Sequence, residues 1–508
     1  MNKELKKGMG LPMIYSLIID AGTSSIRGII FDTDHKIVHI ASQRYFMDVS
    51  EDGTALQKAE SYQVCLEKMM QDCAEWAEGR KGKIHRIALT AGRSSVLPVD
   101  EKGDPLGPIM MWYDKRPQDI CDRLNADYGD EIYRVTGMYA RPMFSAPKMR
   151  WLKENYPAVY EQSHKLVGIQ DYLIFLLTGE WVTDLTFASR TNLLDLNSNR
   201  WSDRMLEIFG IDEQKLCRLV EPGSEVGILK KSWQNRGFDP ETKIYTAGGD
   251  QQCSAIGQGL LASGKIGINN GTASYVAVCS RSRLEDKEKV IHVNKGAVLG
   301  TWIMEASNMG TGSVYDWIRK ILFDYEEDAV SIEAMNQALN NSTAGADGIM
   351  AWPYLAGKGM PDWDCHKAGG VLNLKLSSTK ENIARAFLEA LVFEIADCYR
   401  RIERMVGRPE VIQVSGGLSK MPLFNQLLAD VLDRELVTVS CKETTGIGAY
   451  ISMLLGCGEI EEKDISDILI QEKTAVYTPE IEQVTLYTAL QKKRRQIEER
   501  MPFEAISE

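Results

Sequence analysis

Several features that define common protein classes are missing from this chain of 508 residues. Its ten cysteines include no C-x-x-C pair, which argues against a zinc site or a disulfide framework and favours reduced thiols. No apolar run reaches the roughly 20 residues that span a bilayer. The short apolar run Leu11–Ile19 lacks a cleavage pattern, so we expect a core strand there rather than a signal peptide.

The chain also lacks a net positive charge and the commonest catalytic patterns. The formal net charge of −12 argues against nucleic acid or an anionic membrane as the main partner. No G-x-x-x-x-G-K-[ST] P-loop occurs, and the six histidines are dispersed and form no convincing triad. These absences predict a cytoplasmic protein that uses neither a P-loop nor a histidine-based site.

The composition that remains is that of a globular protein, with 44% hydrophobic and 26% charged residues. The chain is longer than one hydrophobic core normally supports, so we expect two domains. The Gly- and Pro-containing segment Glu221–Glu241 predicts the division between them, and the strand Lys243–Ala247 would begin the second half. We place the N-terminal domain at residues 1–245 and the C-terminal domain at residues 246–508.

Strand-like and helix-like patterns alternate along the whole chain, which predicts an α/β fold. In the first half, Ala59–Glu78 has the pattern of a helix and Ile84–Thr90 that of a strand. The clearest helix is Asn382–Met405, whose apolar residues recur with the period of an amphipathic helix. A strand at Glu410–Val414 and a helix at Leu423–Leu432 follow it.

Two strand–turn–strand hairpins share a Gly-Thr turn followed by small or hydroxyl residues. The first hairpin, Tyr15–Phe31, turns at Gly22-Thr23, and the second, Ile266–Cys279, turns at Gly271-Thr272. Such turns present backbone N–H groups and hydroxyls to an anion, and glycine allows a close approach. The repeated hairpin predicts two related lobes, each with a phosphate-holding turn, and therefore a nucleotide site.

The first turn carries the groups that a terminal phosphate needs. Thr23, Ser24 and Ser25 would bind phosphate oxygens, and Arg27 would neutralise their charge. Asp20 ends the preceding strand and could hold Mg²⁺ through water. Simpler interpretations stay open, because small residues are common in hairpin turns and an aspartate can cap a turn.

Three further segments join a strand to a helix through glycine. In Gly248-Gly249-Asp250 the aspartate could accept a proton from an attacking hydroxyl, and it could equally cap the following helix. Gly416-Gly417 could lie against an adenine ring, and Gly310–Ser313 precedes a helix that could face a ribose or phosphate. Each of these segments alone is common in α/β proteins.

Together these elements resemble the FGGY family of carbohydrate kinases over nearly the whole chain. The segment Met143–Asn155 satisfies one family signature, a small or Pro residue followed by Lys, apolar, any, Trp and apolar. A second signature fits less well around Gly370–Glu389, where the spacing is longer than usual. Other matching segments are Gln170–Tyr172, Leu177–Glu180, Thr183-Asp184, Gly248–Gln251 and Ser415–Gly417.

The resemblance implies two actin-like lobes of the ribonuclease H type that flank a deep catalytic cleft, with MgATP held mainly by the second lobe. It also implies that Asp250 is the general base, and that Asp20 and Asp250 are the candidate metal ligands. The predicted ATP-binding residues are Thr23, Ser24, Ser25, Arg27, Gly271, Thr272, Gly312, Asp316, Gly416, Gly417 and Asn425.

The sugar-binding residues implied by the resemblance are Arg93, Trp112, Asp114, Asp250 and Gln251. The aspartate of the W-x-D segment would bind hydroxyls, and the indole would form an apolar wall. Gln251 matches glycerol kinases, but the glutamate that should follow Arg93 is missing. Neither the glycerol kinase nor the xylulokinase pattern fits completely. We favour a ketopentose such as xylulose, with glycerol or another polyol or ketose as the alternative.

The expected activity is phosphoryl transfer from ATP to an alcohol group of a sugar, with Mg²⁺ as cofactor. A different class is an actin-like ATPase that does not phosphorylate sugar, but such a protein would need neither Trp112 nor Asp114 nor the segment Lys148–Trp151. A silent sugar-sensing relative is disfavoured because Asp20 and Asp250 are intact. The expected partners are the sugar and MgATP, and a homodimer is the default assembly.

Overall fold

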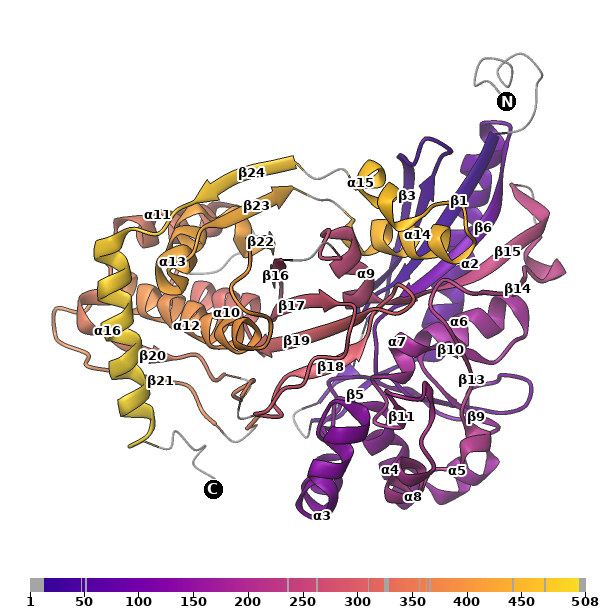
Figure 1. Ribbon diagram of the computed structural model, residues 1–508, viewed down its shortest axis with the longest axis horizontal. Helices are drawn as coiled ribbons and strands as arrows, with labels where there is room; N and C mark the ends of the chain where they lie inside the picture. Colours follow the sequence, from indigo (N-terminus) through magenta and orange to yellow (C-terminus); the bar gives the residue numbers. More distant parts are fainter. Residues whose placement is uncertain are drawn as a thin grey trace. The chain divides into compact units, whose positions relative to one another are not determined.

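The computed structural model describes residues 13–46, 48–50, 53–234, 237–261, 264–308, 310–323, 329–355, 357–361, 363–364, 367–440, 443–469 and 472–501. The chain divides into two compact units (Figure 1). Unit 1 comprises Met1–Gly259, Val293–Ile303 and Glu443–Ile470, and unit 2 comprises Leu260–His292, Met304–Lys442 and Gln471–Glu508. Each unit is built around its own β-sheet, so the predicted α/β class is confirmed.

The sheet of unit 1 has six strands in the order β14-β15-β6-β1-β2-β3. β1 pairs antiparallel with β2, and β2 with β3, whereas β6 runs parallel to β1 and β15 parallel to β6. The central strand β1 is buried along its whole second half, as a strand covered on both faces must be. The strands are β1 (Met13–Ala21), β2 (Ser25–Phe31), β3 (Ile37–Arg44), β6 (Gly82–Ala91), β14 (Glu225–Ile228) and β15 (Phe238–Gly249).

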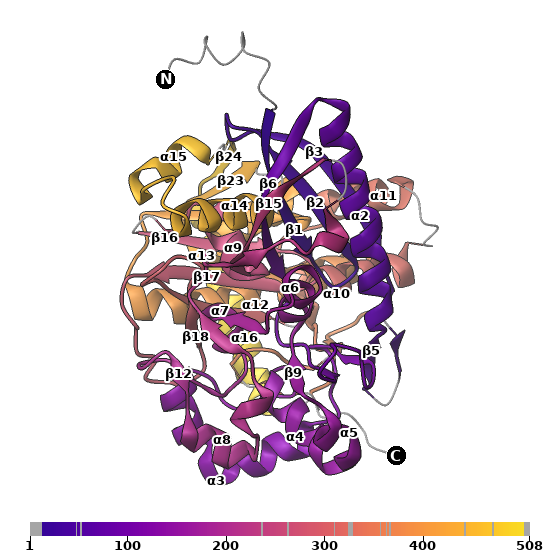
Figure 2. The same ribbon diagram turned by 90° about the vertical axis from the view of Figure 1, so that its right-hand side faces the viewer.

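Helices cover both faces of this sheet (Figure 2). Successive residues of β2 show the two faces, because side chains alternate along a strand. A Cβ atom at Gly28 would collide with Met69 and Cys73 of α2 (Ala59–Gly79), whereas the neighbouring Ile29 packs on Gly446 of α14 (Thr444–Gly456). The helix α9 (Asp250–Gly257) packs against α14.

A second hydrophobic core of unit 1 forms around α4 (Ser145–Asn155) and α8 (Asp203–Phe209). Ser202 caps the N-terminus of α8, because its hydroxyl accepts a hydrogen bond from the backbone N–H of Met205. The other elements here are β4 (Asp48–Val49), β5 (Ala55–Gln57), β7 (Leu97–Val99), β8 (Ile109–Met110), α3 (Gln118–Thr136), α5 (Pro157–Gln162), β9 (Lys165–Val167), α6 (Ile169–Thr178), β10 (Val182–Asp184), α7 (Leu185–Ala188), β11 (Leu194–Asp195), β12 (Arg200–Trp201), β13 (Arg218–Val220) and α15 (Ile465–Ile468).

The second sheet has seven strands in the order β18-β19-β17-β16-β22-β23-β24. Its first strand in sequence, β16, pairs antiparallel with β17 and parallel with β22, which repeats the connections of β1 with β2 and β6. The predicted duplication of the hairpin is therefore confirmed. The strands are β16 (Lys265–Asn270), β17 (Ser274–Ser280), β18 (His292–Lys295), β19 (Trp302–Asn308), β22 (Val411–Gly416), β23 (Leu436–Ser440) and β24 (Glu472–Tyr477).

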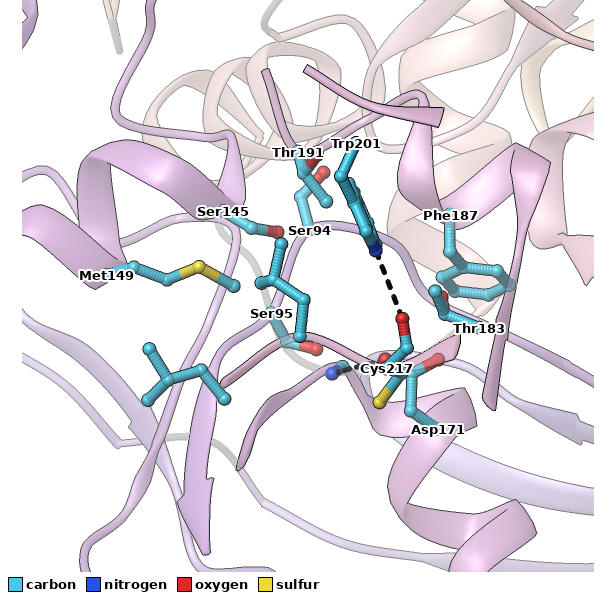
Figure 3. Close-up of a pocket in the computed structure, with 13 residues that line it drawn as sticks. Ser94, Ser95, Ser145, Met149, Asp171, Thr183, Phe187, Thr191, Trp201 and Cys217 are labelled. Atoms are coloured by element: carbon cyan, nitrogen blue, oxygen red, sulfur yellow. Dashed lines mark hydrogen bonds between the residues drawn. The ribbon is translucent and has the colours of Figure 1, made fainter. Parts of the chain in front are cut away.

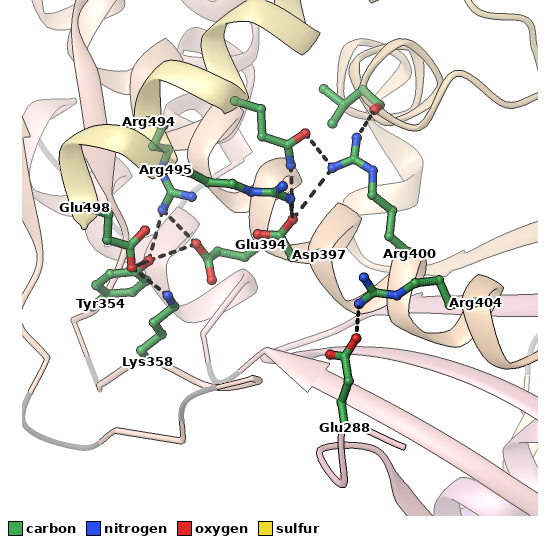
Figure 4. Close-up of polar contacts among 12 residues, drawn as sticks. Glu288, Tyr354, Lys358, Glu394, Asp397, Arg400, Arg404, Arg494, Arg495 and Glu498 are labelled. Atoms are coloured by element: carbon green, nitrogen blue, oxygen red, sulfur yellow. Dashed lines mark hydrogen bonds and ion pairs between the residues drawn. The ribbon is translucent and has the colours of Figure 1, made fainter. Parts of the chain in front are cut away.

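The long helix α12 (Lys380–Val406) packs on β17 and forms the centre of the helical layer of unit 2. Thr379 caps its N-terminus by accepting a hydrogen bond from the Asn382 N–H. A buried ion pair, Arg494 with Glu394 at 2.7 Å, ties α12 to the C-terminal helix α16 (Ile481–Glu498) (Figure 4). The remaining elements are α10 (Gly312–Leu322), α11 (Ala329–Asn341), β20 (Met350–Trp352), β21 (Gly370–Leu372) and α13 (Pro422–Leu432).

One strand forms where the sequence predicts it, but its predicted place in the second half is wrong. Lys243–Ala247 was expected to begin the second half, but it lies within β15, which pairs with β6 in the first sheet. The physical reason is that β15 is a parallel, buried strand whose apolar run completes the core of that sheet. The domain boundary between residues 245 and 246 stays a prediction. Among the described residues, none of the helices is both long and apolar enough to cross a bilayer.

Candidate functional site

The turn between β1 and β2 is fixed by contacts to its backbone. The Gly22 N–H donates to the Ser25 carbonyl at 3.0 Å, and the Tyr45 hydroxyl donates to the carbonyls of Gly22 and Ser25. The Gln57 side-chain amide donates to the Thr23 carbonyl at 2.8 Å. Thr23 and Ser25 are half-buried, and Ser24 is exposed. The predicted phosphate-binding hydroxyls therefore lie together on a turn that the surrounding residues hold in place.

An ionic cluster lies at the base of this turn. Arg27 pairs with Asp20 at 2.5 Å and with Glu443, the residue before α14, at 2.6 Å. Burial raises the pKa of Asp20, while the charge of Arg27 opposes this effect. Arg27 and Asp20 are opposite each other in the β1–β2 register, which explains the pair. Arg27, which was predicted to bind phosphate, thus also neutralises the charge of Asp20, which was predicted to hold Mg²⁺.

Asp250 is the first residue of α9, directly after the end of β15. Its side chain is 29% exposed, and its carboxylate accepts a hydrogen bond from the Gln251 N–H at 2.7 Å. Gly248 has a φ of +114°, a conformation that favours glycine, and its missing Cβ leaves room for Ala297. The Gly249 N–H donates to the hydroxyl of Thr186 at 2.8 Å. These contacts leave the Asp250 carboxylate partly open to solvent at a fixed strand end.

Arg93 lies against Asp250. Its Nε is 3.3 Å from Asp250 Oδ1, and its Nη1 donates to Gln252 Oε1 at 3.0 Å. A Cβ atom at Gly249 would be only 2.5 Å from Arg93 Cδ, so the arginine side chain packs directly against that glycine. The two residues meet because β6 and β15 are parallel neighbours whose last paired residues are Ala91 and Gly249. The structure therefore brings together two residues predicted for the sugar site.

Trp112 joins the predicted sugar site to the phosphate turn. Its indole stacks on Tyr113, and its Nε1 donates to Thr23 Oγ1 at 3.4 Å. Asp114, two residues later, has no exposed surface. Its carboxylate accepts hydrogen bonds from Arg116 at 2.6–3.1 Å and from the Ala55 N–H at 3.3 Å. Arg116 and the Ala55 N–H thus bond to both oxygens of a carboxylate that was expected to bind sugar hydroxyls. The role of Asp114 in sugar binding stays a prediction.

A small cavity lies beside the Arg93–Ser94 segment (Figure 3). The space open to the centre of a water molecule is about 30 Å³, enough for one or two waters but too small for a sugar. Ser94 Oγ and Asp171 Oδ1 line it, and both are buried without a hydrogen-bond partner among the described residues. Burial raises the pKa of Asp171 to about 7. The other polar residues around the cavity are Ser95, Ser145, Thr183 and Thr191.

The turn between β16 and β17 in unit 2 packs against the start of α10. The Gly312 N–H donates to the Gly271 carbonyl and the Thr311 N–H to the Thr272 carbonyl, both at 3.0 Å. A Cβ atom at Gly312 would be 2.5 Å from that Gly271 oxygen, so only glycine fits. The Ser274 hydroxyl lies 2.7 Å from both Asn270 Oδ1 and Thr311 Oγ1. Three predicted ATP-binding residues therefore lie in one place.

Gly416 lies next to this turn, at the end of β22. It is opposite Asn270 in the parallel pair, and with a φ of +96° it tolerates no side chain, because a Cβ atom would be 2.4 Å from the Asn270 oxygen. Gly416 and Gly417 are exposed. Asn425 is buried on α13 and donates to the Ser419 carbonyl at 2.8 Å, which supports the glycine loop from below.

Asp316 behaves differently from the other predicted ATP-binding residues of unit 2. Its side chain is 64% exposed, and it pairs with Arg319 one turn later on α10. Among the described residues, it forms no hydrogen bond or ion pair with the Gly271–Thr272 turn or the Gly416 loop. Its part in nucleotide binding stays a prediction that rests on sequence alone.

Sequence reasoning missed several residues that hold these groups in place. Tyr45 and Gln252 each bond to a predicted site residue from another element, and Thr186 bonds to Gly249, the residue before Asp250. Lys148 was noticed only as part of a signature, yet it is completely buried, and burial lowers its pKa to about 7 although Asp114 opposes the shift. These residues carry no local pattern of their own, because their role depends on contacts between distant segments.

The chain is similar in sequence and in structure to known carbohydrate kinases. The models of the N-terminal and C-terminal domains of the FGGY family of carbohydrate kinases match residues 15–257 and 267–455. A glycerol kinase of Thermococcus gammatolerans is 29% identical over 86% of this chain and 87% of its own length. A xylulose kinase of Lactococcus lactis is 25% identical over 94% of each chain. The crystal structure of a gluconate kinase from Lactobacillus acidophilus superposes with a TM-score of 0.89, at 25% identity over 96% of this chain and 98% of that one.

Proposed function

This chain belongs to the FGGY family of carbohydrate kinases, and from this premise we propose that it transfers the γ-phosphoryl group of ATP to a primary hydroxyl of a small open-chain sugar. The enzyme is a phosphotransferase with an alcohol group as acceptor. The relatives above are named for glycerol, xylulose and gluconate, which are all open-chain polyhydroxy compounds with a primary hydroxyl. We favour a ketopentose such as xylulose, and keep glycerol and other polyols or ketoses as the alternative.

The observation that carries this proposal is the position of Asp250. A base for phosphoryl transfer must reach the proton of the attacking hydroxyl, and Asp250 is partly exposed at the carboxyl end of β15. An aspartate is ionised at pH 7 but is a weak base, because its ordinary pKa is about 3.9. Its contribution therefore depends on alignment, which Arg93 and the Gln251 N–H provide by holding the carboxylate.

In the proposed sugar site, Arg93 and Gln251 flank Asp250, and Trp112 supplies an apolar wall beside them. Polyhydroxy compounds present both C–H faces and hydroxyls, which an indole and polar side chains can bind together. Asp114 remains part of the proposal, and Arg116 would have to share that carboxylate with a sugar hydroxyl. The absence of a Glu after Arg93 is the feature that disfavours glycerol.

Unit 2 supplies the groups we assign to ATP. Gly271, Thr272 and the start of α10 present N–H groups and a hydroxyl to phosphate, and the bare glycines Gly416-Gly417 suit the flat face of adenine. In unit 1, Thr23, Ser24, Ser25 and Arg27 suit the terminal phosphates.

We further propose that Mg²⁺ accompanies the nucleotide. This ion keeps several waters and takes one or two protein carboxylates, and it would neutralise charge on the transferring phosphoryl group. Asp250 fits as such a ligand because its carboxylate is partly exposed, and Asp20 fits through water because Arg27 already binds one of its oxygens. Among the described residues, no cluster of three or more His, Cys, Asp and Glu side chains is arranged to hold a metal.

A screen of ATP consumption tests the proposal. The purified chain is incubated with MgATP and each of a set of ketopentoses, ketohexoses, aldonates and polyols. We expect rapid ADP formation with one chemical group of these compounds and slow hydrolysis without them. Equal ADP formation with and without every compound would favour an actin-like ATPase and would contradict the sugar kinase. Measurement of the phosphorylated carbon by ³¹P NMR identifies the hydroxyl attacked.

A further inference from the structure

The helix α4 touches both segments that form the proposed sugar site. Lys148 and Trp151 are three residues apart on this helix, and that spacing places them on the same side. Lys148 contacts the segment Arg93–Ser94, and Trp151 contacts Arg116, which binds Asp114. The two residues thus reach two segments that are otherwise separate in the sequence.

Lys148 holds the backbone at Ser94. Its Nζ donates to the Ser94 carbonyl at 3.1 Å and to the Phe144 carbonyl at 3.0 Å, and the side chain has no exposed surface. Burial of an amino group is costly unless it is hydrogen-bonded, and these two carbonyls supply the acceptors for Lys148. Ser94 has a φ of +67°, which is strained for a residue other than glycine and needs support from its surroundings.

The turn at Ser94 borders a small cavity. The cavity in Figure 3 lies on one side of it, with Ser94 from the turn and Ser145 and Met149 from α4 in its wall. The Ser94 hydroxyl itself forms no hydrogen bond among the described residues. The bond from Lys148 to the Ser94 carbonyl is therefore a directional contact that helps to fix the Ser94 backbone.

The position of Ser94 determines that of Arg93. The guanidinium of Arg93 reaches Asp250 and Gln252, and its stem lies under Gly249. A shift of the turn by about 1 Å would break these contacts, and misplacement of that size can cost roughly 10²-fold in rate. Lys148 therefore acts on the proposed base through Arg93.

Trp151 supports the second segment in the same manner. The Arg116 guanidinium lies 4.1 Å from the centre of the Trp151 ring, a cation–π geometry. Arg116 in turn binds both oxygens of Asp114, which fixes the segment that begins with Trp112. The indole thus sets the plane of the guanidinium that orients the W-x-D segment.

We propose that Lys148 and Trp151 are positioning residues, through which α4 holds the Arg93 turn and the Trp112–Asp114 segment in register for one sugar. This inference rests on the proposed function and adds two residues that do not touch the sugar. It also gives a physical reason for their spacing of three residues, because both must lie on the side of α4 that faces these segments.

The test compares Lys148→Met with Lys153→Met. Lys153 lies on the same helix and also donates to a backbone carbonyl, that of Gly210 at 2.6 Å, but among the described residues it forms no hydrogen bond or ion pair with either sugar-binding segment. We expect Lys148→Met to lower kcat/KM for the sugar by roughly 10²-fold, with a raised KM, while the affinity for ADP stays within about twofold. Lys153→Met should leave kcat and KM within about twofold, although it lowers the unfolding midpoint.

A second measurement separates positioning from general destabilisation. Lys148→Ala leaves space for a small amine, so ethylammonium at high concentration should restore part of kcat/KM, whereas tetramethylammonium, which cannot donate a hydrogen bond, should not. For Trp151→Leu we expect a loss of about tenfold or less, because only one aromatic–cation contact disappears. The Lys148→Met/Trp151→Leu double variant should show the product of the two losses if the segments are held separately.

Each outcome bears on the inference. If Lys148→Met matches Lys153→Met in kcat and KM, or if both amines act alike on Lys148→Ala, the inference is wrong. Should Lys148→Met fail to fold, the Lys148→Ala rescue and the Trp151→Leu kinetics decide the question. A wild-type chain that phosphorylates none of the screened compounds overturns the proposed function, whereas an active wild type with an unaffected Lys148→Met overturns only the positioning role.

Discussion

The two Gly-Thr turns differ in what surrounds them. In unit 1, ion pairs stabilise the base of the turn, since Arg27 binds both Asp20 and Glu443. In unit 2, hydrogen bonds between neutral groups stabilise the corresponding turn, since the Ser274 hydroxyl bonds to both Asn270 and Thr311. The same strand–turn–strand device is thus stabilised by ion pairs in one unit and by hydroxyls and an amide in the other.

The turns also differ in how tightly the backbone is packed. A Cβ atom at Gly22 in unit 1 would lie 3.6 Å from its nearest neighbour, which is an ordinary contact. At Gly312 and Gly416 in unit 2, a Cβ atom would lie 2.5 and 2.4 Å from backbone oxygens. Close packing in unit 2 suits a fixed backbone cradle for a nucleotide, and the charged cluster in unit 1 suits groups that respond to phosphate charge.

The largest effect we predict is for Asp250→Asn, which tests whether the chemistry belongs to unit 1. The amide keeps the shape of the side chain but cannot accept the hydroxyl proton, so kcat should fall roughly 10³-fold. ADP affinity, measured by calorimetry, should remain near that of the wild type because unit 2 is unchanged. Asp127→Asn, an exposed substitution on α3, is the control. Wild-type turnover by Asp250→Asn would remove this residue as the base.

The next effect compares the glycines of the two turns. Gly312→Ala places a methyl group against the Gly271 carbonyl and should weaken ADP binding by about tenfold, a cost typical of overpacking. Gly22→Ala meets no close neighbour, and its effect on binding and turnover should be within about twofold. Calorimetric titration of both variants with ADP provides the measurement. Equal losses at the two positions would show that backbone crowding does not distinguish the turns.

The sequence predicts the strands on both sides of each turn because the patterns that specify them are local. Short apolar runs around Gly-Thr specify strands β1, β2, β16 and β17, and the long amphipathic period specifies α12. Strand Lys243–Ala247 was also recognised, but a local pattern does not reveal which sheet a strand joins. That choice depends on pairing with β6, far away in the sequence.

The contacts that complete the site could not be predicted for the same reason. Arg93 meets Asp250 only because two parallel strands end side by side, and Glu443 reaches Arg27 from the start of α14. The sequence also could not predict that Asp114, which pairs with Arg116, is fully buried, since an aspartate close to an arginine in the sequence is usually exposed. Residue types at the site were therefore predictable, and their partners were not.

A smaller effect should separate the charged turn from the neutral one. Arg27→Met removes the cation beside the unit 1 turn and should raise the KM for ATP by about threefold to tenfold at low salt, with a smaller rise at 0.5 M KCl because salt screens the interaction. Ser274→Ala in unit 2 removes only hydroxyl bonds, so its effect should not vary with salt. Initial rates over a salt series provide the comparison. A salt-dependent effect in Ser274→Ala would contradict the neutral character of the second turn.

The same contrast between neutral and ionic support extends to buried acids, and it predicts opposite pH dependence of stability. Asp171 in unit 1 is held by the Gly168 N–H and forms no ion pair among the described residues, and burial raises its pKa to about 7. In unit 2, burial alone would raise the pKa of Glu498, but Lys358 at 2.5 Å outweighs burial and holds the pKa below its usual value.

The signs follow from proton binding. Between about pH 4 and 7 the folded chain keeps a proton on Asp171 that the unfolded chain releases, so stability falls as the pH rises, by at most about 1.4 kcal/mol per pH unit. Asp171→Asn removes this slope and should gain on the wild type as the pH rises from 4.5 to 7.

Glu498→Gln loses an ion pair that is present above about pH 4.3, so its deficit should be largest at pH 7 and vanish as the pH falls below the folded pKa. Urea unfolding followed by tryptophan fluorescence at several pH values measures both, and parallel slopes in the two variants would show that the acids of the two units are held alike.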